Sequence, residues 1–379
     1  MTRLPLRVVA DDRPWDVLAA LEDGHPVAVV DGAATDTIAR ALLHASEHDL
    51  PAGTWLVALT SGSTAAPRAV CRSRASWQAS VAHLAELTGT RAGRRVLVPG
   101  PLSSTLFLHA AWHARQVGAE PVLAQPAGAW DGIAWDVAHL VPHQLARLLD
   151  TPGVELAGRT AVVAGAVLPQ HVAEQARSRG LRVVTYYGAA ELSFVAAGEP
   201  GALRAFPEVD VDVRDGEIWV RSPYVALDYV RPSGSPDEKG PADAPGPWRR
   251  QDGWSTVGDR GGLAQDGSLV VHGRGQAAVQ TGGATVHVAD AEHALRGHPG
   301  VRDVVVTGVA HRELGQVVAA VVESTTASVP ELRRWARATL PPAARPRRWA
   351  VVEELPRTTT GKADRAAVAP LLSRGGGHG

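Results

Sequence analysis

The stretch Trp55–Arg68, with the sequence WLVALTSGSTAAPR, decides how the rest of this chain is interpreted. Trp55–Leu59 is an apolar run typical of a buried strand, and a loop of four hydroxyls, one glycine and a base follows it at Thr60–Arg68. Hydroxyls and backbone N–H groups can surround phosphate oxygens, and a guanidinium group binds phosphate through two parallel N–H bonds. The loop is neither a GxxxxGK[ST] nor a GxSxG motif. It is therefore a candidate phosphate-binding loop, with a Ser/Thr-rich surface turn as the alternative.

Composition excludes several classes of protein. The 379 residues carry a formal net charge of −1, which provides no basic surface for nucleic acid. Cys71 is the single cysteine, so neither a disulfide framework nor a Cys-rich zinc site can form within the chain. No apolar run approaches the roughly 18 to 20 residues that cross a bilayer. The stretch Met1–Trp15 lacks the apolar segment of a signal peptide, so we expect a cytoplasmic protein of two or three domains.

Strand-like and helical patterns alternate over the first 190 residues, which predicts βαβ units and a largely parallel sheet. The predicted strands are Pro26–Val30, Trp55–Leu59, Arg95–Val98, Pro121–Ala124, Ala138–Val141, Thr160–Ala164 and Arg182–Tyr186. The predicted helices are Asp36–His48, Arg74–Leu87, Thr105–Val117, Pro142–Leu149 and Pro169–Arg179.

The second half of the chain has a different pattern. Short alternating strands are predicted around Asp-Gly turns at Asp215-Gly216 and Asp266-Gly267, and the Pro/Gly-rich stretch Arg231–Gly246 is predicted to be an exposed loop. From about Ala277 onward the pattern indicates a compact α+β segment. Its predicted elements are Ala289–Arg296, Val301–Val309, Gln316–Val322, Val329–Thr339, Arg348–Val352 and a helix at Lys362–Leu372.

Three further motifs carry chemically useful side chains. Tyr186–Glu191, YYGAAE, offers an aromatic ring that can stack on a base and a carboxylate that can bind a metal ion. Val257–Asp259 is followed by Gly273-Arg274, and Leu355–Arg365 reads LPRTTTGKADR. The last motif contains Lys362, one of only two lysines among the 38 Lys and Arg residues of the chain.

In order and spacing these motifs resemble those of the adenylate-forming (ANL) superfamily of acyl-CoA synthetases, peptide-synthetase adenylation domains and luciferases. The superfamily patterns are TSGSTGxPK, YGxTE, TGD, GRxD with a GG turn, and LPxTxxGKxxR. This chain has TSGSTAAPR, YGAAE, VGD, GRGQ with Gly282-Gly283, and LPRTTTGKADR. The resemblance covers about residues 54 to 372, and the shortened N-terminal region is similar to that of short o-succinylbenzoate-CoA ligases.

The resemblance implies an α/β fold with two domains. A large N-terminal domain, residues 1–275, should consist of βαβ sheets and a small distorted β-barrel at about residues 205–275. A mobile α+β lid, residues 276–379, should rotate about a hinge at Gln276.

The resemblance also implies the site residues, with Lys362, Glu191 and Arg68 as the catalytic set and Glu191 as the Mg²⁺ ligand. Lys362 should reach the substrate carboxylate and the α-phosphate. Asp259 should bind the ribose hydroxyls, and Tyr187 should stack on adenine. The remaining residues implied to bind nucleotide are Thr60, Ser61, Gly62, Ser63, Thr64, Gly165, Ala166, Gly188, Arg274, Gly282 and Gly283.

The implied reaction joins a small carboxylic acid to a thiol at the expense of ATP, through an acyl-adenylate. The implied cofactors are ATP, Mg²⁺ and coenzyme A. The alternative acceptor is the phosphopantetheine thiol of an acyl carrier protein. We expect a monomer or homodimer, and neither a nucleic-acid partner nor a membrane span.

Several positions depart from the superfamily pattern. Ala190 stands where relatives have a Thr that bonds the phosphate region, Ala65 replaces a Gly, and Gln276 replaces the usual Asp or Lys of the hinge. These changes favour a third hypothesis, a weakened homologue that binds nucleotide without turnover. His109 and His113 share one face of a predicted helix, where packing is favoured over metal binding because the HExxH glutamate and a third ligand are missing.

Overall fold

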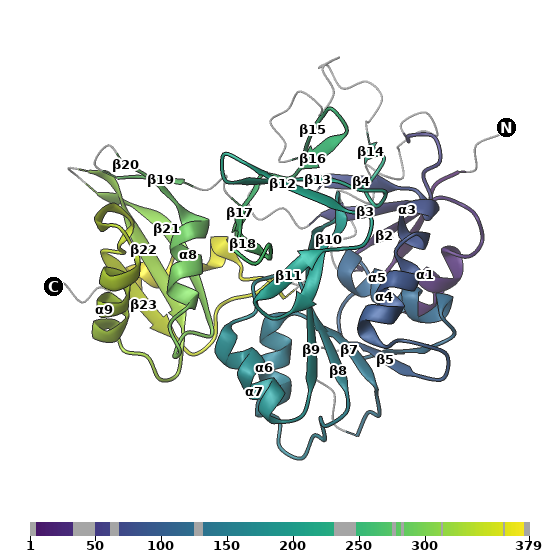
Figure 1. The fold of residues 1–379 in the computed structure, drawn as a ribbon, viewed down its shortest axis with the longest axis horizontal. Coiled ribbons are helices and arrows are strands. Elements are labelled where there is room, and N and C mark those ends of the chain that lie inside the picture. Colours follow the sequence, from purple (N-terminus) through teal and green to yellow (C-terminus); the bar gives the residue numbers. More distant parts are fainter. Residues whose placement is uncertain are drawn as a thin grey trace.

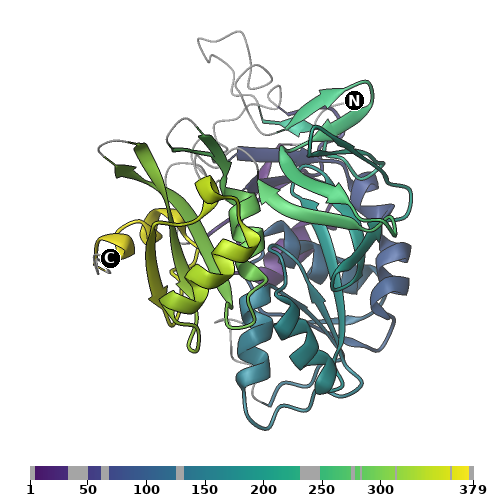
Figure 2. The ribbon, with the colours of Figure 1, turned by 60° about the vertical axis from the view of Figure 1, so that its left-hand side comes forward.

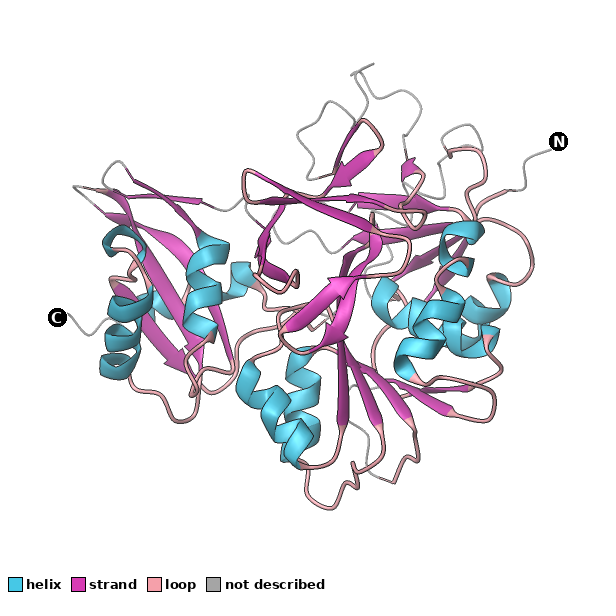
Figure 3. Cartoon of the chain, in the orientation of Figure 1, coloured by secondary structure: helices cyan, strands magenta, loops and turns pink. Residues whose placement is uncertain are grey.

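The computed structural model describes residues 5–32, 50–60, 68–124, 132–230, 248–274, 278–281, 284–311, 314–358 and 361–374, and it is a mixed α/β structure with three sheets (Figures 1 and 3). The predicted helix Asp36–His48 and the predicted loop Arg231–Gly246 lie outside these residues. Among the helices of these segments, none has the length and apolar character needed to cross a membrane.

The first sheet presents the two ends of the hydroxyl loop. Its strand order is β1 (Arg7–Ala10), β2 (Val27–Val30), β3 (Leu56–Thr60), β4 (Arg68–Arg72) and β14 (Asp228–Tyr229). Strands β1 to β3 are parallel, whereas β3 and β4 are antiparallel with Thr60 opposite Arg68. The candidate phosphate loop is therefore the connection of a hairpin. Strand β1 and helix α1 (Pro14–Ala20) were not predicted, because charged residues interrupt their apolar pattern.

The second sheet has the predicted parallel half. Strands β6 (Glu120–Leu123), β5 (Arg95–Val98), β7 (Val137–Leu140), β8 (Thr160–Val163) and β9 (Arg182–Ala189) pair in parallel in that order. Val96, Val98, Val137 and Val162 share a core with helix α5 (Thr105–Gln116) and with the first sheet. Leu97, Ala138, Leu140 and Ala161 face helices α6 (Pro142–Asp150) and α7 (Gln170–Ser178). Each strand is thus buried on both faces, as expected for a parallel sheet.

The same sheet continues beyond β9 in antiparallel strands. Their order is β10 (Ser193–Glu199), β11 (Ala202–Ala205), β18 (Leu269–Arg274), β17 (Asp259–Leu263), β13 (Glu217–Arg221), β16 (Trp254–Thr256) and β15 (Arg249–Gln251), with β12 (Asp210–Arg214) also paired to β13. The predicted turn at Asp215-Gly216 joins β12 to β13 with φ angles of 51° and 75°, as a two-residue hairpin turn requires.

Two predictions about local structure were wrong. The predicted strand ends at Tyr186, but Tyr187–Ala189 also belong to β9, because β10 pairs with them. Gly188 allows this pairing, since a methyl group there would lie 1.9 Å from the carbonyl oxygen of Ser193. The single helix expected at Arg74–Leu87 is divided into α3 (Arg74–Gln78) and α4 (Val81–Thr88).

The third sheet is separate from the other two and uses only residues after Arg274 (Figures 1 and 2). Its strands are β20 (Ala284–His287), β19 (Ala278–Thr281), β22 (Gly315–Glu323), β21 (Asp303–His311) and β23 (Arg348–Val352). Helices α8 (Val288–Arg296) and α9 (Val329–Thr339) and the short helix η2 (Pro342–Ala344) pack on one face of this sheet. Helices α10 (Arg365–Val368) and α11 (Leu371–Arg374) pack on the other face. The boundary at Gln276 stays a prediction, because residues 275–277 are not described.

The helix predicted at Lys362–Leu372 was also wrong. Asp364 is the N-cap of α10, and its carboxylate accepts the backbone N–H groups of Ala366 and Ala367 at 3.0 and 3.2 Å. A side chain that caps the first turn fixes the helix start. Lys362 consequently lies before the helix, in a turn where its carbonyl accepts the N–H of Thr358.

Between the first two sheets lies a group of three tryptophans. The rings of Trp55, Trp77 and Trp112 are 5.5 to 5.6 Å apart in pairs, and all three side chains are buried. The ring of His109 lies 4.7 Å from that of Trp77. His109 and His113 on α5 are therefore packed side chains, as predicted, and no cluster of metal-ligating side chains exists within the described ranges.

His113 and His139 are buried in this region as neutral rings. Burial lowers the pKa of His113 to about 4 and that of His139 to about 3. An unfolded chain binds a proton at each of these rings below a pKa of about 6.5. The folded state does not bind these protons until the pH is much lower, so the free energy of unfolding should fall as the pH drops from about 6.5 toward 4.

We predict that this loss amounts to roughly 1–2 kcal/mol per buried histidine between pH 7 and pH 5. Urea unfolding at the two pH values measures it. His139→Leu should reduce the loss by the contribution of one histidine. Equal pH dependence in the wild type and His139→Leu would contradict the assignment.

Candidate active site

The carboxyl ends of the parallel strands carry the first part of the site. Val141 follows β7, and Gly165 follows β8 with a φ of 87°, so a side chain there would be strained. A methyl group on Gly165 would lie 3.2 Å from Cγ1 of Val141. In open α/β sheets this edge is where ligands bind. Gly165 and Ala166 are exposed at this edge, as a nucleotide-binding role would require.

The turn that carries Lys362 lies against the same valine. Gly361 has a φ of 79°, and a methyl group on it would lie 3.0 Å from Cγ2 of Val141 and 2.6 Å from Cε1 of His143. Val141 therefore contacts Gly165 through one methyl group and Gly361 through the other. The LPRTTTGKADR motif of the C-terminal segment and the Gly165 turn are brought together here, although 196 positions separate Gly165 from Gly361.

Tyr187 and Asp259 form a second pair of predicted site residues. The Tyr187 hydroxyl donates a hydrogen bond of 2.8 Å to Oδ2 of Asp259, which joins β9 to β17. Asp259 lies opposite Arg274 in the ladder of β17 and β18. Residues from three of the five motifs are thus adjacent, as their proposed contacts with one adenosine group would require.

Glu191 provides a buried carboxylate. Only 2% of its surface is exposed, and its Oε1 accepts the hydroxyl of Tyr229 at 2.9 Å. Its Oε2 is buried and has no hydrogen-bond partner within the described part of the chain. An ionised oxygen is costly to bury in this way unless a cation or donor joins it. This orphaned oxygen fits a ligand for a divalent cation, since carboxylate oxygen is what Mg²⁺ prefers.

Arg68 and Glu191 both contact Tyr229. The guanidinium carbon of Arg68 is 5.9 Å from the centroid of the Tyr229 ring, a cation–π distance. The backbone of Thr60 is fixed opposite Arg68. Ser61, Gly62, Ser63, Thr64, Gln276, Gly282 and Gly283 lie outside the described residues, so their predicted roles stay predictions.

Sequence reasoning missed three residues at this site. Tyr229 touches both Glu191 and Arg68, Arg72 donates hydrogen bonds to the carbonyls of Ala190 and Tyr224, and His143 contacts Gly361. None belongs to a recognised motif. The signal available was an arginine inside an apolar strand, AVCRS, which could have indicated a buried charge with a partner.

Family models match most of the chain. Residues 9–230 match the model of the AMP-binding enzyme family, and residues 290–362 match that of the AMP-binding enzyme C-terminal domain. The chain belongs to the AMP-binding enzyme family. The two matches include TSGSTAAPR, YGAAE and the first eight residues of LPRTTTGKADR, and the VGD and GRGQ segments lie between the two matches.

Two similar proteins are named as CoA ligases. The chain is 27% identical over 349 residues to the uncharacterized acyl-CoA ligase YhfT of Bacillus subtilis, covering 85% of this chain and 69% of that protein. It is 36% identical over 241 residues to a probable 2-succinylbenzoate-CoA ligase of Mycobacterium tuberculosis, covering 60% of this chain and 59% of that protein. The chain therefore spans between three-fifths and seven-tenths of the length of these relatives.

The fold of this AMP-binding family member is also that of a solved ligase structure. A variant of E. coli MenE with bound OSB-AMS superposes with a TM-score of 0.80 at 23% identity, covering 99% of this chain and 89% of MenE. This likeness confirms the predicted adenylate-forming fold, a large sheet-rich region and a small C-terminal unit.

Polar contacts join the C-terminal unit to the rest of the chain. Arg302 is 3.3 Å from Asp150 at the end of α6, and His272 of β18 is 3.1 Å from Asp290 of α8. Surface pairs of this kind contribute little stability each. Weak pairs of this kind would allow the C-terminal unit to separate from the rest of the chain and return to it.

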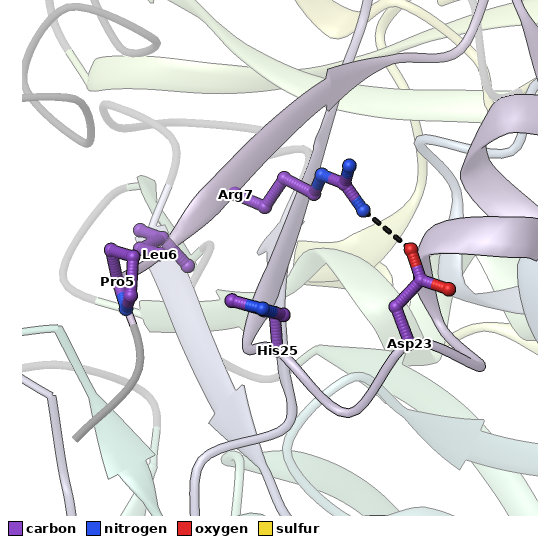
Figure 4. Close-up of a pocket in the computed structure, with 5 residues that line it drawn as sticks. All are labelled: Pro5, Leu6, Arg7, Asp23 and His25. Carbon is purple, nitrogen blue, oxygen red and sulfur yellow. Dashed lines mark hydrogen bonds and ion pairs between the residues drawn. The ribbon is translucent and has the colours of Figure 1, made fainter. Parts of the chain in front are cut away.

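A pocket at the start of β1 lies apart from these residues. Pro5, Leu6, Arg7, Asp23 and His25 line it, and Arg7 forms an ion pair with Asp23 at 2.6 Å (Figure 4). None of the predicted site residues lines this pocket, so we assign it no part in the reaction.

We predict that Gly361→Ala displaces the turn that carries Lys362, because the added methyl group would overlap His143 and the positive φ would strain alanine. Limited trypsin digestion should cut after Lys362 several-fold faster than in the wild type. Gly24→Ala is the matched control: its φ is 81°, but open space surrounds it. Unchanged cleavage in Gly361→Ala would show that contact with His143 does not hold the turn in position.

Proposed function

We propose that this chain is an ATP-dependent carboxylate–CoA ligase that forms an acyl-adenylate and then an acyl thioester. The observation that carries the proposal is the position of the Lys362 turn at the carboxyl edge of the sheet, against Val141, together with the buried carboxylate of Glu191 and the Tyr187–Asp259 pair. The names of the relatives, both CoA ligases, support the same class of reaction.

The chemistry explains why these groups are needed. In the first step a carboxylate oxygen of the acid forms a bond to the α-phosphorus of ATP, the bond to the bridging oxygen breaks, and pyrophosphate leaves. Both reactants are anions, so cations must be directed at the charge that develops in the transition state. Lys362, Arg68 and Mg²⁺ on Glu191 are the proposed sources. Mg²⁺ would supply positive charge to phosphate oxygens.

The second step uses a thiol. Its sulfur forms a bond to the acyl carbon, the bond from that carbon to the AMP oxygen breaks, and AMP leaves. Lys362 stands on an exposed turn of the C-terminal segment, so its charge can be withdrawn when this segment moves. The proposed acceptor is coenzyme A. A holo acyl carrier protein is the competing acceptor, and comparing the two thiols with preformed acyl-AMP decides between them.

The direct test is ATP–pyrophosphate exchange with a panel of aromatic and aliphatic carboxylic acids. We expect exchange that depends on one class of acid and on Mg²⁺. If ATP binds but no acid supports exchange, the enzymatic proposal fails and the weakened-homologue hypothesis, motivated by Ala190 and Ala65, replaces it.

We predict that Lys362→Ala lowers the adenylation rate by roughly 10²–10³-fold, the usual loss when one transition-state donor is removed. Thioester formation from supplied acyl-AMP should stay within about twofold of the wild type, because this step does not use Lys362. Lys239→Ala, which alters the other lysine, is the control and should affect neither step. An equal loss in both steps would contradict the role of Lys362.

A further inference from the structure

Tyr229 is the residue that holds the side chain of Glu191. It lies on β14, opposite Val70 of β4, and its hydroxyl donates to Oε1 of Glu191 at 2.9 Å. The tyrosine is 7% exposed. A carboxylate oxygen accepts and a phenolic hydroxyl donates, so Tyr229 is the donor in this contact.

The two oxygens of Glu191 differ in their surroundings. The Tyr229 hydroxyl holds Oε1, whereas Oε2 has no partner among the residues that the structure describes. A carboxylate held at one oxygen cannot rotate freely about its last bond. The hydrogen bond thus sets the direction of the lone pairs on Oε2.

Arg72 holds the backbone of the same turn. Its side chain is 1% exposed, and its two Nη groups donate to the carbonyls of Ala190 and Tyr224. Burial lowers the pKa of Arg72 to about 10, partly offset by the charge of Glu191, so the group stays protonated at neutral pH. Its positive charge offsets part of the cost of burying Glu191.

We propose that Tyr229 is a positioning residue: its hydroxyl fixes one oxygen of Glu191 so that the other binds the divalent cation of a metal–ATP complex. Arg72 fixes the turn below it. The chain has alanine at position 190, so this turn has no hydroxyl of its own, and the donor comes from β14 instead. This inference rests on the proposed function, in which Glu191 receives Mg²⁺.

The test is calorimetric titration of the full chain with ATP, without any acid, once in excess Mg²⁺ and once in EDTA. The wild type should bind ATP more tightly with Mg²⁺. In Tyr229→Phe this gain should shrink roughly tenfold, as expected when a hydrogen bond to a charged group is lost. The affinity in EDTA should stay unchanged, because Tyr229 acts through the metal ligand.

Tyr224→Phe is the matched control. Tyr224 is also a buried residue, but its hydroxyl donates to the carbonyl of Pro207 at 2.8 Å, and its backbone carbonyl still accepts from Arg72. The metal-dependent gain should be that of the wild type. If Tyr229→Phe does not fold, Tyr229→Met, which also lacks the hydroxyl, is expected to give the same loss.

Three results would overturn the inference: a full metal-dependent gain in Tyr229→Phe, an equal loss of affinity with and without Mg²⁺, or no metal dependence in the wild type. Because the titration contains no acid, its outcome is independent of the exchange assay. A chain that shows the coupling but no exchange would retain the role of Tyr229 and lose the proposed ligase activity.

Discussion

The buried carboxylate of Glu191 is the constraint on which the centre of the structure depends. A carboxyl group at 2% exposure needs donors or charge to match it, and the matching groups come from the first sheet although Glu191 belongs to the second. Arg72 of β4 and Tyr229 of β14 reach across to the turn between β9 and β10. A backbone hydrogen bond also reaches this turn, since Ala226 donates its N–H to the carbonyl of Glu191 at 2.8 Å. The polar requirement of one side chain therefore joins two sheets.

A second contact, between small and apolar groups, positions the C-terminal unit against the rest of the chain. Val141 lies between Gly165 and Gly361, and both glycines have positive φ angles and no side chain to keep the segments apart. Two ion pairs between this unit and the rest of the described chain, Arg302–Asp150 and His272–Asp290, are partly exposed. Exposed ion pairs contribute little stability each, so contacts of this kind would suit the proposed movement of the C-terminal unit.

The sequence predicted the parts of the fold that depend on local pattern. Strands β2, β3, β5, β7 and β8 and helices α5, α6 and α9 appear within a residue or two of their predicted bounds. Two of the errors have different causes. Tyr187–Ala189 are strand because the distant strand β10 pairs with them, whereas the C-terminal helix starts at Arg365 because the neighbouring Asp364 caps it. Neither fact is visible in hydrophobic periodicity.

The same distinction separates the site residues. Glu191, Tyr187, Asp259 and Lys362 stand in motifs, so their positions could be predicted. Arg72, Tyr229 and His143 act through partners that are 118, 38 and 218 positions away, respectively, and only the folded chain shows those pairs.

The tryptophan group between the first two sheets also has an optical consequence. Indole rings 5.5 to 5.6 Å apart couple electronically, so Trp55, Trp77 and Trp112 should give a strong near-ultraviolet circular dichroism band that the separate chromophores would not. One ring comes from the edge of β3, one from α3 and one from α5. The intensity of this band therefore reports whether β3, the strand before the candidate phosphate loop, is packed against helices α3 and α5.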